Sequence, residues 1–316
     1  MWDAAEPGIL EIFTHKEVIA RFRHVTYGME GAGLPAKKKF ITAWMADINK
    51  ATCQRMGVYM TLPFGPVMDT ESGFMNFNVF PGFRAASLAG VNDGDVEALV
   101  EPIVRHVHVW IAGRHAGRTK WFIDWLANIL QHPHNKHKTG LVVNGEMQYA
   151  KGILPGFFRE CVLGTDCSFQ TSSVRDSVFA RFASGVKSVV FLQLDEELHG
   201  MDEPIPRRCS TDRGQLNGLI TEDYITHEER YKNRVTIKNL VNLYMTTDHT
   251  TEADISWKYA LFEAGRMEED GDVAYLDGLR AHLARPEVAR AFYQFLMARD
   301  LSEFTTFSLP PPLDAA

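Results

Sequence analysis

Four residues near the middle of the chain have the types and spacing of a phosphate-binding loop. Gly145 opens the segment, Ala150 and Lys151 follow, and Gly152 closes it. The intact pattern is Gly, any four residues, Gly, Lys, and then Ser or Thr. In such a loop, backbone N–H groups bind the phosphates and the lysine reaches the terminal phosphate oxygens. The sequence therefore predicts a nucleotide site at Gly145, Ala150, Lys151 and Gly152, formed by an incomplete motif.

The departures from the pattern have different chemical consequences. Ala150 adds one methyl group where the chain turns beside the phosphate, and this fits if the residue keeps a negative φ. Gly152 removes the hydroxyl group that binds Mg²⁺. Pro155 lies within the helix that should follow the loop, where it lacks an N–H and favours a kink. The loop retains a lysine for phosphate and has lost a ligand for magnesium.

Two acidic residues of a second candidate motif follow an apolar run at 189–194. Asp195 and Glu196 match a second ATPase motif, in which one carboxylate binds Mg²⁺ and the other orients the attacking water. We assign the metal-binding role to Asp195. The simpler alternative is that both side chains are merely solvated after a strand. A third apolar run, 240–245, leads to Asp248 at the corresponding position.

The elements that must position these residues alternate between strands and helices. Apolar runs at 141–144, 189–194 and 240–245 predict three buried parallel strands, and the helix after the loop should begin near Lys151. Further helices are expected at 118–130, 212–220, 273–283 and 286–297, with a hairpin within 222–238. Short aromatic runs in the first 117 residues predict an α+β region with short strands. The fold class is therefore α/β, with the site at the carboxyl ends of the strands.

The composition of the chain argues against several classes of protein. The chain has 316 residues, 45% of them hydrophobic, and a formal net charge of −7 with a pI near 6.0, which does not suit a dedicated nucleic-acid binder. Its four cysteines form no C-x-x-C pair, as expected in a reducing compartment. We find no membrane-length apolar segment and no export signal, so we expect a cytoplasmic protein or one of a viral replication compartment, without a membrane partner.

The order of motifs resembles the superfamily 3 helicase domain of viral and phage primase-helicases, in the poxvirus-type group of AAA+ ATPases. Similar segments also occur outside the three motifs, at 40–44, 77–83, 121–130, 216–221, 225–239 and 295–304. The last of these resembles the closing helix of the family. The resemblance implies a P-loop core with a parallel sheet flanked by helices. The resemblance also divides the chain into an N-terminal α+β region at 1–117, an ATPase core at 118–265 and a C-terminal helical segment at 266–316.

The resemblance also implies cofactors and partners. ATP and Mg²⁺ would bind at the loop, and a ring of identical subunits, usually a hexamer, would thread single-stranded DNA past a basic hairpin. The matching hairpin residues are Arg230, Tyr231, Lys232 and Arg234, which offer positive charge and a ring for stacking. A solvated charged loop is the alternative interpretation. We expect the priming activity of the family to be absent or to reside in a separate primase chain.

Two further positions differ from the family pattern. Asp248 stands where the family has an asparagine that positions the water, and its charge would repel the γ-phosphate unless it is protonated or bound to metal. Lys258 stands where the family has an arginine finger for the neighbouring subunit, and it lacks the fork of an arginine. The expected catalytic residues are thus Lys151, Asp195, Glu196 and Asp248, with Lys258 as a weak finger candidate.

Two hypotheses about activity therefore remain open. The first is a working ATP-dependent DNA-unwinding or translocating protein of viral or phage genome replication. The second is a catalytically degenerate pseudo-ATPase that serves as a structural, oligomeric or nucleic-acid-binding module. A metal site among His132, His134 and His137, or at His106 and His108 on an expected strand, is a weaker alternative.

Overall fold

The computed structural model describes residues 15–28, 37–47, 55–57, 65–68, 75–78, 82–90, 92–145, 148–172, 189–195, 207–227, 235–247, 258–265 and 270–313, together with Phe80. The chain forms two compact units, Met1–Pro81 and Gly82–Ala316. Each unit is described by itself.

The first unit contains short helices and short strands, as the aromatic runs predicted. Its elements are α1 (His15–Phe22), β1 (Thr26–Gly28), β2 (Lys37–Lys39), α2 (Phe40–Ala46), β3 (Arg55–Gly57), β4 (Gly65–Met68) and β5 (Met75–Asn78). Strands β1 and β2 pair antiparallel, whereas β5 pairs parallel with β3 and antiparallel with β4. The predicted α+β character is confirmed for this unit, whereas residues 82–117, which the prediction included, belong to the second unit.

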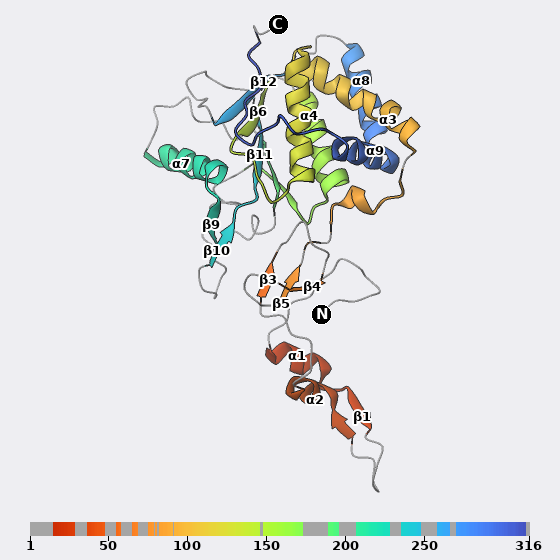
Figure 1. The fold of residues 1–316 in the computed structure, drawn as a ribbon, viewed down its shortest axis with the longest axis vertical. Coiled ribbons are helices and arrows are strands. Elements are labelled where there is room, and N and C mark those ends of the chain that lie inside the picture. The colour runs from red at the N-terminus through yellow and green to blue at the C-terminus, as the bar shows by residue number, and fades with distance from the viewer. Residues whose placement is uncertain are drawn as a thin grey trace. The chain divides into compact units, whose positions relative to one another are not determined.

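The second unit is built on a parallel sheet of five strands (Figure 1). Its strands are β6 (Gly140–Asn144), β7 (Ser168–Thr171), β8 (Phe191–Asp195), β11 (Asn242–Thr247) and β12 (Tyr259–Glu263), in the order β12-β6-β11-β8-β7. Its helical segments are η1 (Arg84–Ser87), α3 (Asp93–His106), η2 (Val107–Ile111), α4 (Ala116–Gln131), α5 (Gln148–Phe157), η3 (Phe158–Leu163), α7 (Arg207–Thr221), α8 (Asp270–Leu283) and α9 (Pro286–Met297). A hairpin, β9 (Tyr224–His227) with β10 (Val235–Lys238), follows α7. The predicted α/β fold class is confirmed.

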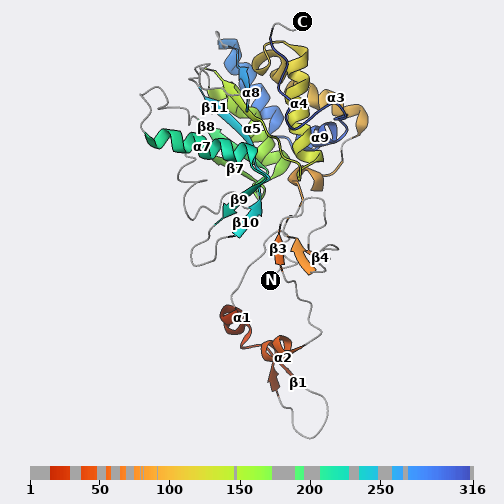
Figure 2. The same ribbon diagram turned by 60° about the vertical axis from the view of Figure 1, so that its left-hand side comes forward.

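Helices cover both faces of this sheet, which is why its strands read as continuous apolar runs. On one face, Leu216, Leu219 and Ile220 of α7 pack against apolar side chains of β6, β8 and β11. On the other face, Phe122 and Trp125 of α4 make edge contacts with aromatic rings of β8, β11 and β12. Figure 2 shows α7 and α4 on opposite sides of the sheet. All residues of the central strand β11 are buried as a result.

The three predicted core strands are confirmed as β6, β8 and β11, whereas the outer strands β7 and β12 were not predicted. Both lie at the edges of the sheet, where side chains alternate between buried and partly exposed and the apolar signal is weak. The helix after the loop begins at Gln148 and not near Lys151. It also continues through Pro155 and ends in the π-helical turn η3.

One predicted strand is wrong. His106 and His108 lie at the junction of α3 with the π-helical turn η2, not on a strand. The alternation of Val107, Val109 and Ile111 resembled a strand, but the buried positions Val100, Ile103, Val107 and Ile111 follow a helical spacing.

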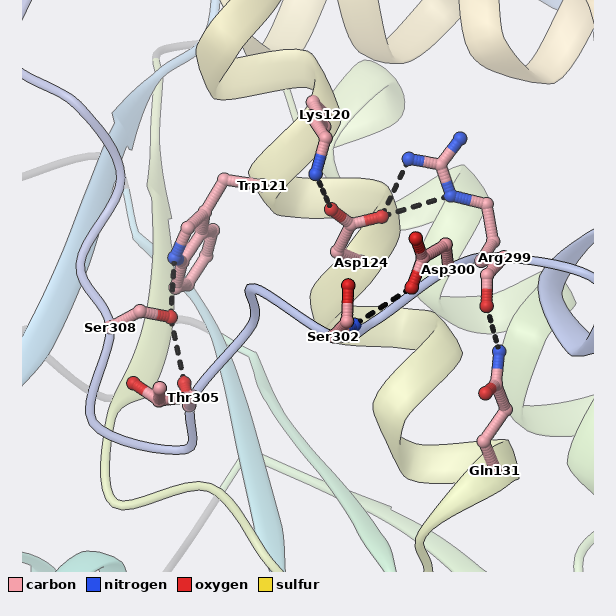
Figure 3. Close-up of polar contacts among 9 residues, drawn as sticks. All are labelled: Lys120, Trp121, Asp124, Gln131, Arg299, Asp300, Ser302, Thr305 and Ser308. Carbon is pink, nitrogen blue, oxygen red and sulfur yellow. Dashed lines mark hydrogen bonds and ion pairs between the residues drawn. The ribbon is translucent and has the colours of Figure 1, made fainter.

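The chain after α9 runs along α4 as an irregular strap, so the helix expected over 295–304 ends at Met297. Figure 3 shows how the strap is attached. Arg299 donates from Nε and from one terminal nitrogen to Asp124 Oδ1, at 2.9 and 2.6 Å, while Lys120 binds Oδ2 at 2.8 Å. Trp121 donates to Ser308 Oγ at 3.1 Å. Buried Asp124 is therefore paired with one cation from the strap and one from its own helix.

Packing within the second unit crosses the segment boundaries expected from the motifs. Helix α9 packs on both α3 and α4, so residues on either side of positions 117 and 265 share one core. The division into 1–117, 118–265 and 266–316 stays a prediction based on motif content. None of the helices in the described ranges is long and apolar enough to cross a membrane.

The two partners of Asp124 should contribute unequally to stability. Replacing Arg299 with Met leaves the carboxylate, only 2% exposed, with one cation, and we expect a loss of about 3 kcal/mol in the free energy of unfolding. Lys120→Met removes a cation that is 57% exposed, and the expected loss is at most about 1 kcal/mol. Urea unfolding of the two variants measures both values. Equal losses would contradict this assignment.

Candidate nucleotide site

The carboxyl ends of three neighbouring strands bring the predicted loop and the predicted acidic motif together. Gly145 directly follows β6, and the register pairs Asn144 with Thr247 at the end of β11. On the other side of β11, Thr246 pairs with Asp195 at the end of β8. The site is therefore organised around two consecutive threonines of the central strand.

Lys151 connects the loop to β11. It lies in the first turn of α5 and is only 1% exposed. Its Nζ donates to the carbonyl oxygen of Gly145 at 2.8 Å and to that of Thr247 at 2.9 Å. The backbone N–H of Gly145 also donates to Thr247 O, at 3.0 Å. The ammonium group thus lies between the start of the loop and the end of β11, where backbone carbonyls accept its hydrogen bonds.

The two glycines of the motif differ in the space around them. A Cβ atom on Gly145 would lie 2.9 Å from Ala264 Cβ, so the close approach of the chain after β12 requires glycine here. A Cβ atom on Gly152 would meet nothing within 4 Å. The missing hydroxyl at position 152 is therefore not a consequence of steric exclusion, and a serine could occupy this position.

Asp195 is half-buried, and its carboxylate accepts three hydrogen bonds. Oδ1 accepts from Gln193 Nε2 at 2.9 Å and from Thr246 Oγ1 at 3.1 Å, while Oδ2 accepts from Gln170 Nε2 of β7. Gln170 Oε1 in turn accepts from Arg159 at 2.7 Å, and this contact fixes which end of the amide faces Asp195. The carboxylate is thereby oriented, and Oδ2 keeps a lone pair for a further partner.

Tyr244 compensates for the proline in α5. Pro155 has no N–H to donate to the carbonyl of Lys151 one turn earlier. The hydroxyl of Tyr244 donates to this carbonyl instead, at 3.1 Å, from the buried middle of β11. Burial, and secondly the charge of Asp195, raise the pKa of Tyr244 far above its usual value, so the hydroxyl stays a donor. The lysine of the motif is therefore held through both its side chain and its backbone.

Several predicted site residues lie outside the described residues. These are Glu196, Asp248, Arg230, Tyr231, Lys232 and Arg234, and of Ala150 only the helical backbone is described. The hairpin predicted to carry the four nucleic-acid candidates is present, because His227 pairs with Val235 across residues 228–234.

Lys258, the weak finger candidate, precedes β12, and its carbonyl accepts a hydrogen bond from Gly140 N at 2.8 Å. It lies at the amino-terminal edge of the sheet, away from Lys151 and Asp195.

The donors and acceptors of the site fit a phosphate group with a hydrated magnesium ion. Lys151 supplies the cation for phosphate, and Asp195 Oδ2 can bind Mg²⁺ or one of its waters. Asn144 Oδ1, at the start of the loop, is a buried acceptor without a hydrogen-bond partner in the part of the chain that the structure describes. A water of a hydrated cation could donate to it. To reach a phosphate, however, the Lys151 ammonium must exchange its carbonyl partners for phosphate oxygens.

The histidines considered as metal ligands have separate partners. His108 contacts Thr119 at 3.0 Å, His132 contacts Asn128 at 3.1 Å, and His137 contacts the Trp125 carbonyl at 2.9 Å. Burial lowers the pKa of His137 to about 3, so this ring stays neutral. Among the described residues, no three His, Cys, Asp or Glu side chains are grouped to hold a metal ion.

The residues that orient the motif side chains belong to no sequence motif. Thr246, Gln193 and Gln170 bind Asp195, and Tyr244 binds the carbonyl of Lys151, through contacts that only the structure reveals. Gln193 offered a signal, because it is the one polar residue in the run 189–194, and it is 2% exposed. A polar side chain buried beside a motif acid is expected to hydrogen-bond to it.

Comparisons with known proteins bear on the fold. A scan with models of protein families gave no match, and neither did a search of curated proteins. Among solved structures, an A-form apo structure of the NrS-1 C-terminal region matches with a TM-score of 0.58 at 14% identity, and an apo structure of this region with 0.58 at 13% identity. Both matches cover 80% of this chain and 57% of the other, so this chain spans little more than half of their length. The likeness shows a shared fold.

The assignment of Tyr244 predicts a dependence on Pro155. Tyr244→Phe leaves the buried Lys151 carbonyl without a donor, and we expect a loss of about 1 to 3 kcal/mol in the free energy of unfolding. In a Pro155→Ala background, the new N–H at position 155 can donate to the same carbonyl. The effect of Tyr244→Phe should then fall below about 1 kcal/mol. Urea unfolding of the four proteins measures this coupling, and an equal loss in both backgrounds would contradict it.

Proposed function

We propose that this chain is a superfamily 3 helicase-like protein of viral or phage genome replication, which binds ATP with Mg²⁺ and acts on DNA. The observation that carries the proposal is the position of Lys151. Its ammonium lies between the start of the loop and the end of β11, and β11 separates the loop strand from the strand that ends in Asp195. The three segments that resemble the family motifs follow adjacent strands of one sheet, β6, β11 and β8, and this adjacency supports the proposal.

Each residue has a definite part in this proposal. Lys151 binds the terminal phosphate oxygens after leaving its carbonyl partners, and the backbone after Gly145 surrounds the phosphates. Asp195 holds the magnesium ion, directly or through water, with its orientation fixed by Thr246 and Gln170. The bound Mg²⁺ would neutralise part of the negative charge of the phosphates. Glu196 and Asp248 are proposed to act on the attacking water.

The proposal includes DNA and further copies of the chain. Arg230, Tyr231, Lys232 and Arg234 belong to the connection between β9 and β10, and this hairpin is the support for placing a single-stranded DNA contact there. A ring-like homo-oligomer, usually a hexamer in the family that the motifs resemble, would supply the second side of each nucleotide site. Lys258 is proposed as the residue that reaches the neighbouring subunit.

A specific observation favours the second hypothesis, a pseudo-ATPase. Lys151 is 1% exposed and bonded to two carbonyls, so nucleotide binding must break contacts that already satisfy its charge. Gly152 supplies no hydroxyl for Mg²⁺, although its surroundings have room for one. Both features make metal-assisted ATP hydrolysis less favourable but leave the fold intact. In this case the module would bind nucleotide or DNA without hydrolysis.

Substituting Lys151 tests nucleotide binding in either hypothesis. Lys151→Met keeps most of the buried volume and removes the charge, so the affinity for an ATP analogue should fall by about tenfold or more, as for loss of a charge-assisted hydrogen bond. Lys120→Met is the matched control, because Lys120 is an exposed lysine on α4 and its loss should leave the affinity unchanged. Equal affinity of the wild type and Lys151→Met would contradict the proposed site.

Restoring a hydroxyl group at position 152 helps to distinguish the ATP-dependent motor from the pseudo-ATPase. Gly152→Ser should fit without displacing neighbours and should lower the Mg²⁺ concentration that gives half-maximal nucleotide binding. Hydrolysis by the wild type that single-stranded DNA stimulates supports the motor. Binding without turnover in the wild type, combined with tighter Mg²⁺-dependent binding in Gly152→Ser, supports the pseudo-ATPase. A Gly152→Ser protein with unchanged Mg²⁺ dependence would contradict the placement of the magnesium ion.

A further inference from the structure

The end of α7 is closed by residues from distant parts of the chain. A helix leaves its last carbonyl groups without intrahelical donors. In α7, the carbonyl of Leu219 accepts from Lys136 Nζ and from Asn239 Nδ2, and the carbonyl of Thr221 accepts from Lys138 Nζ at 2.9 Å. Both lysines belong to the loop between α4 and β6. Positive charge at this end of a helix is also favoured by the helix dipole.

Lys136 is an unusual residue for this position because it is only 4% exposed. Burial, and secondly the charge of Lys138, lower the pKa of Lys136 to about 7. An amine donates hydrogen bonds in either protonation state, so the contact with Leu219 persists. A buried lysine is unfavourable unless its polar group is bonded. The contact with α7 therefore accounts for the presence of a lysine in this interior position.

The same group of contacts forms the base of the β9–β10 hairpin. Lys138 pairs with Asp223, which lies between α7 and β9. Asn239, directly after β10, donates from its backbone to Asp223 O at 2.8 Å and from Nδ2 to Glu222 O at 2.8 Å. Figure 2 shows the hairpin next to the end of α7. The two ends of the hairpin and the end of the helix are thus joined by one hydrogen-bonded cluster.

On its other side, the lysine segment is attached to the sheet. The backbone N–H of His137 donates to Asn242 Oδ1 at 2.7 Å, at the beginning of β11. The ring of His137 stacks on Trp125 of α4 with 4.8 Å between centroids. Residue 138 is followed after one residue by β6, the strand that ends at Gly145. The segment therefore contacts the hairpin base while it begins the strand of the phosphate loop.

We propose that Lys136 and Lys138 are positioning residues that hold the base of the β9–β10 hairpin on the end of α7, so that binding of single-stranded DNA at this hairpin depends on them. This dependence of DNA binding rests on the proposed function. The attachment of the hairpin rests only on the contacts above. The two parts can therefore be tested separately.

The test uses the full chain with Lys136 and Lys138 both replaced by Met. Loss of their hydrogen bonds should make the amides of 224–227 and 235–238 exchange with deuterium faster, on the order of tenfold, as for two bonds of ordinary strength. The affinity for single-stranded DNA should fall by about the same factor. The affinity for an ATP analogue without DNA should stay unchanged, because both lysines precede the amino-terminal end of β6, whereas Gly145 and Lys151 lie beyond its carboxyl end.

Two further variants act as controls. Lys120→Met removes an exposed lysine that does not touch the hairpin and should change neither exchange nor DNA binding. Lys138→Arg keeps a cationic donor for Thr221 and Asp223 and should retain wild-type DNA affinity. Unchanged hairpin exchange in the double Met variant would overturn the attachment. Faster exchange with unchanged DNA affinity would overturn the dependence of DNA binding on the two lysines. A wild type that binds no DNA would contradict the proposed function and this dependence with it, while the exchange result still decides the attachment.

Discussion

The complete burial of β11 is the constraint on which the second unit depends. A central parallel strand must have both of its faces covered, and here α7 covers one face while α4 covers the other. Because no water reaches this strand, its polar groups need partners within the protein. Tyr244, Thr246 and Thr247 meet this requirement by bonding to residues of the candidate site. The same strand thus completes the core and organises the chemistry at its carboxyl end.

This arrangement explains how the motif can lose residues and still keep its geometry. The lysine is fixed by the carbonyls of Gly145 and Thr247, and its own carbonyl is fixed by Tyr244 in place of the N–H that Pro155 lacks. Asp195 is fixed by hydrogen bonds from Thr246 and other polar neighbours. None of these contacts involves position 150 or 152. The fold of the site is therefore maintained independently of the residues that turnover would require, which is why both functional hypotheses are compatible with it.

The sequence predicted the parts of this structure whose signals are local. Apolar runs long enough to form buried strands located β6, β8 and β11, and the motif spacing placed Gly145 and Asp195 at their ends. The outer strands β7 and β12 were missed because edge strands are half polar, and His106 was assigned to a strand because a short alternating run also fits a helix. The partners of the motif residues could not be predicted, since Tyr244, Gln170 and Lys136 act through contacts between segments far apart in sequence.

Thermal unfolding of the wild-type chain with and without ATP and Mg²⁺ shows whether the folded protein binds nucleotide. A ligand that binds only the folded state stabilises it by about 2.7 kcal/mol at 100 times its Kd, and the effect grows with the logarithm of its concentration. We expect the Tm to rise progressively with ATP concentration, and this rise to disappear in Lys151→Met. A Tm that does not change up to millimolar ATP would contradict a nucleotide site at Lys151.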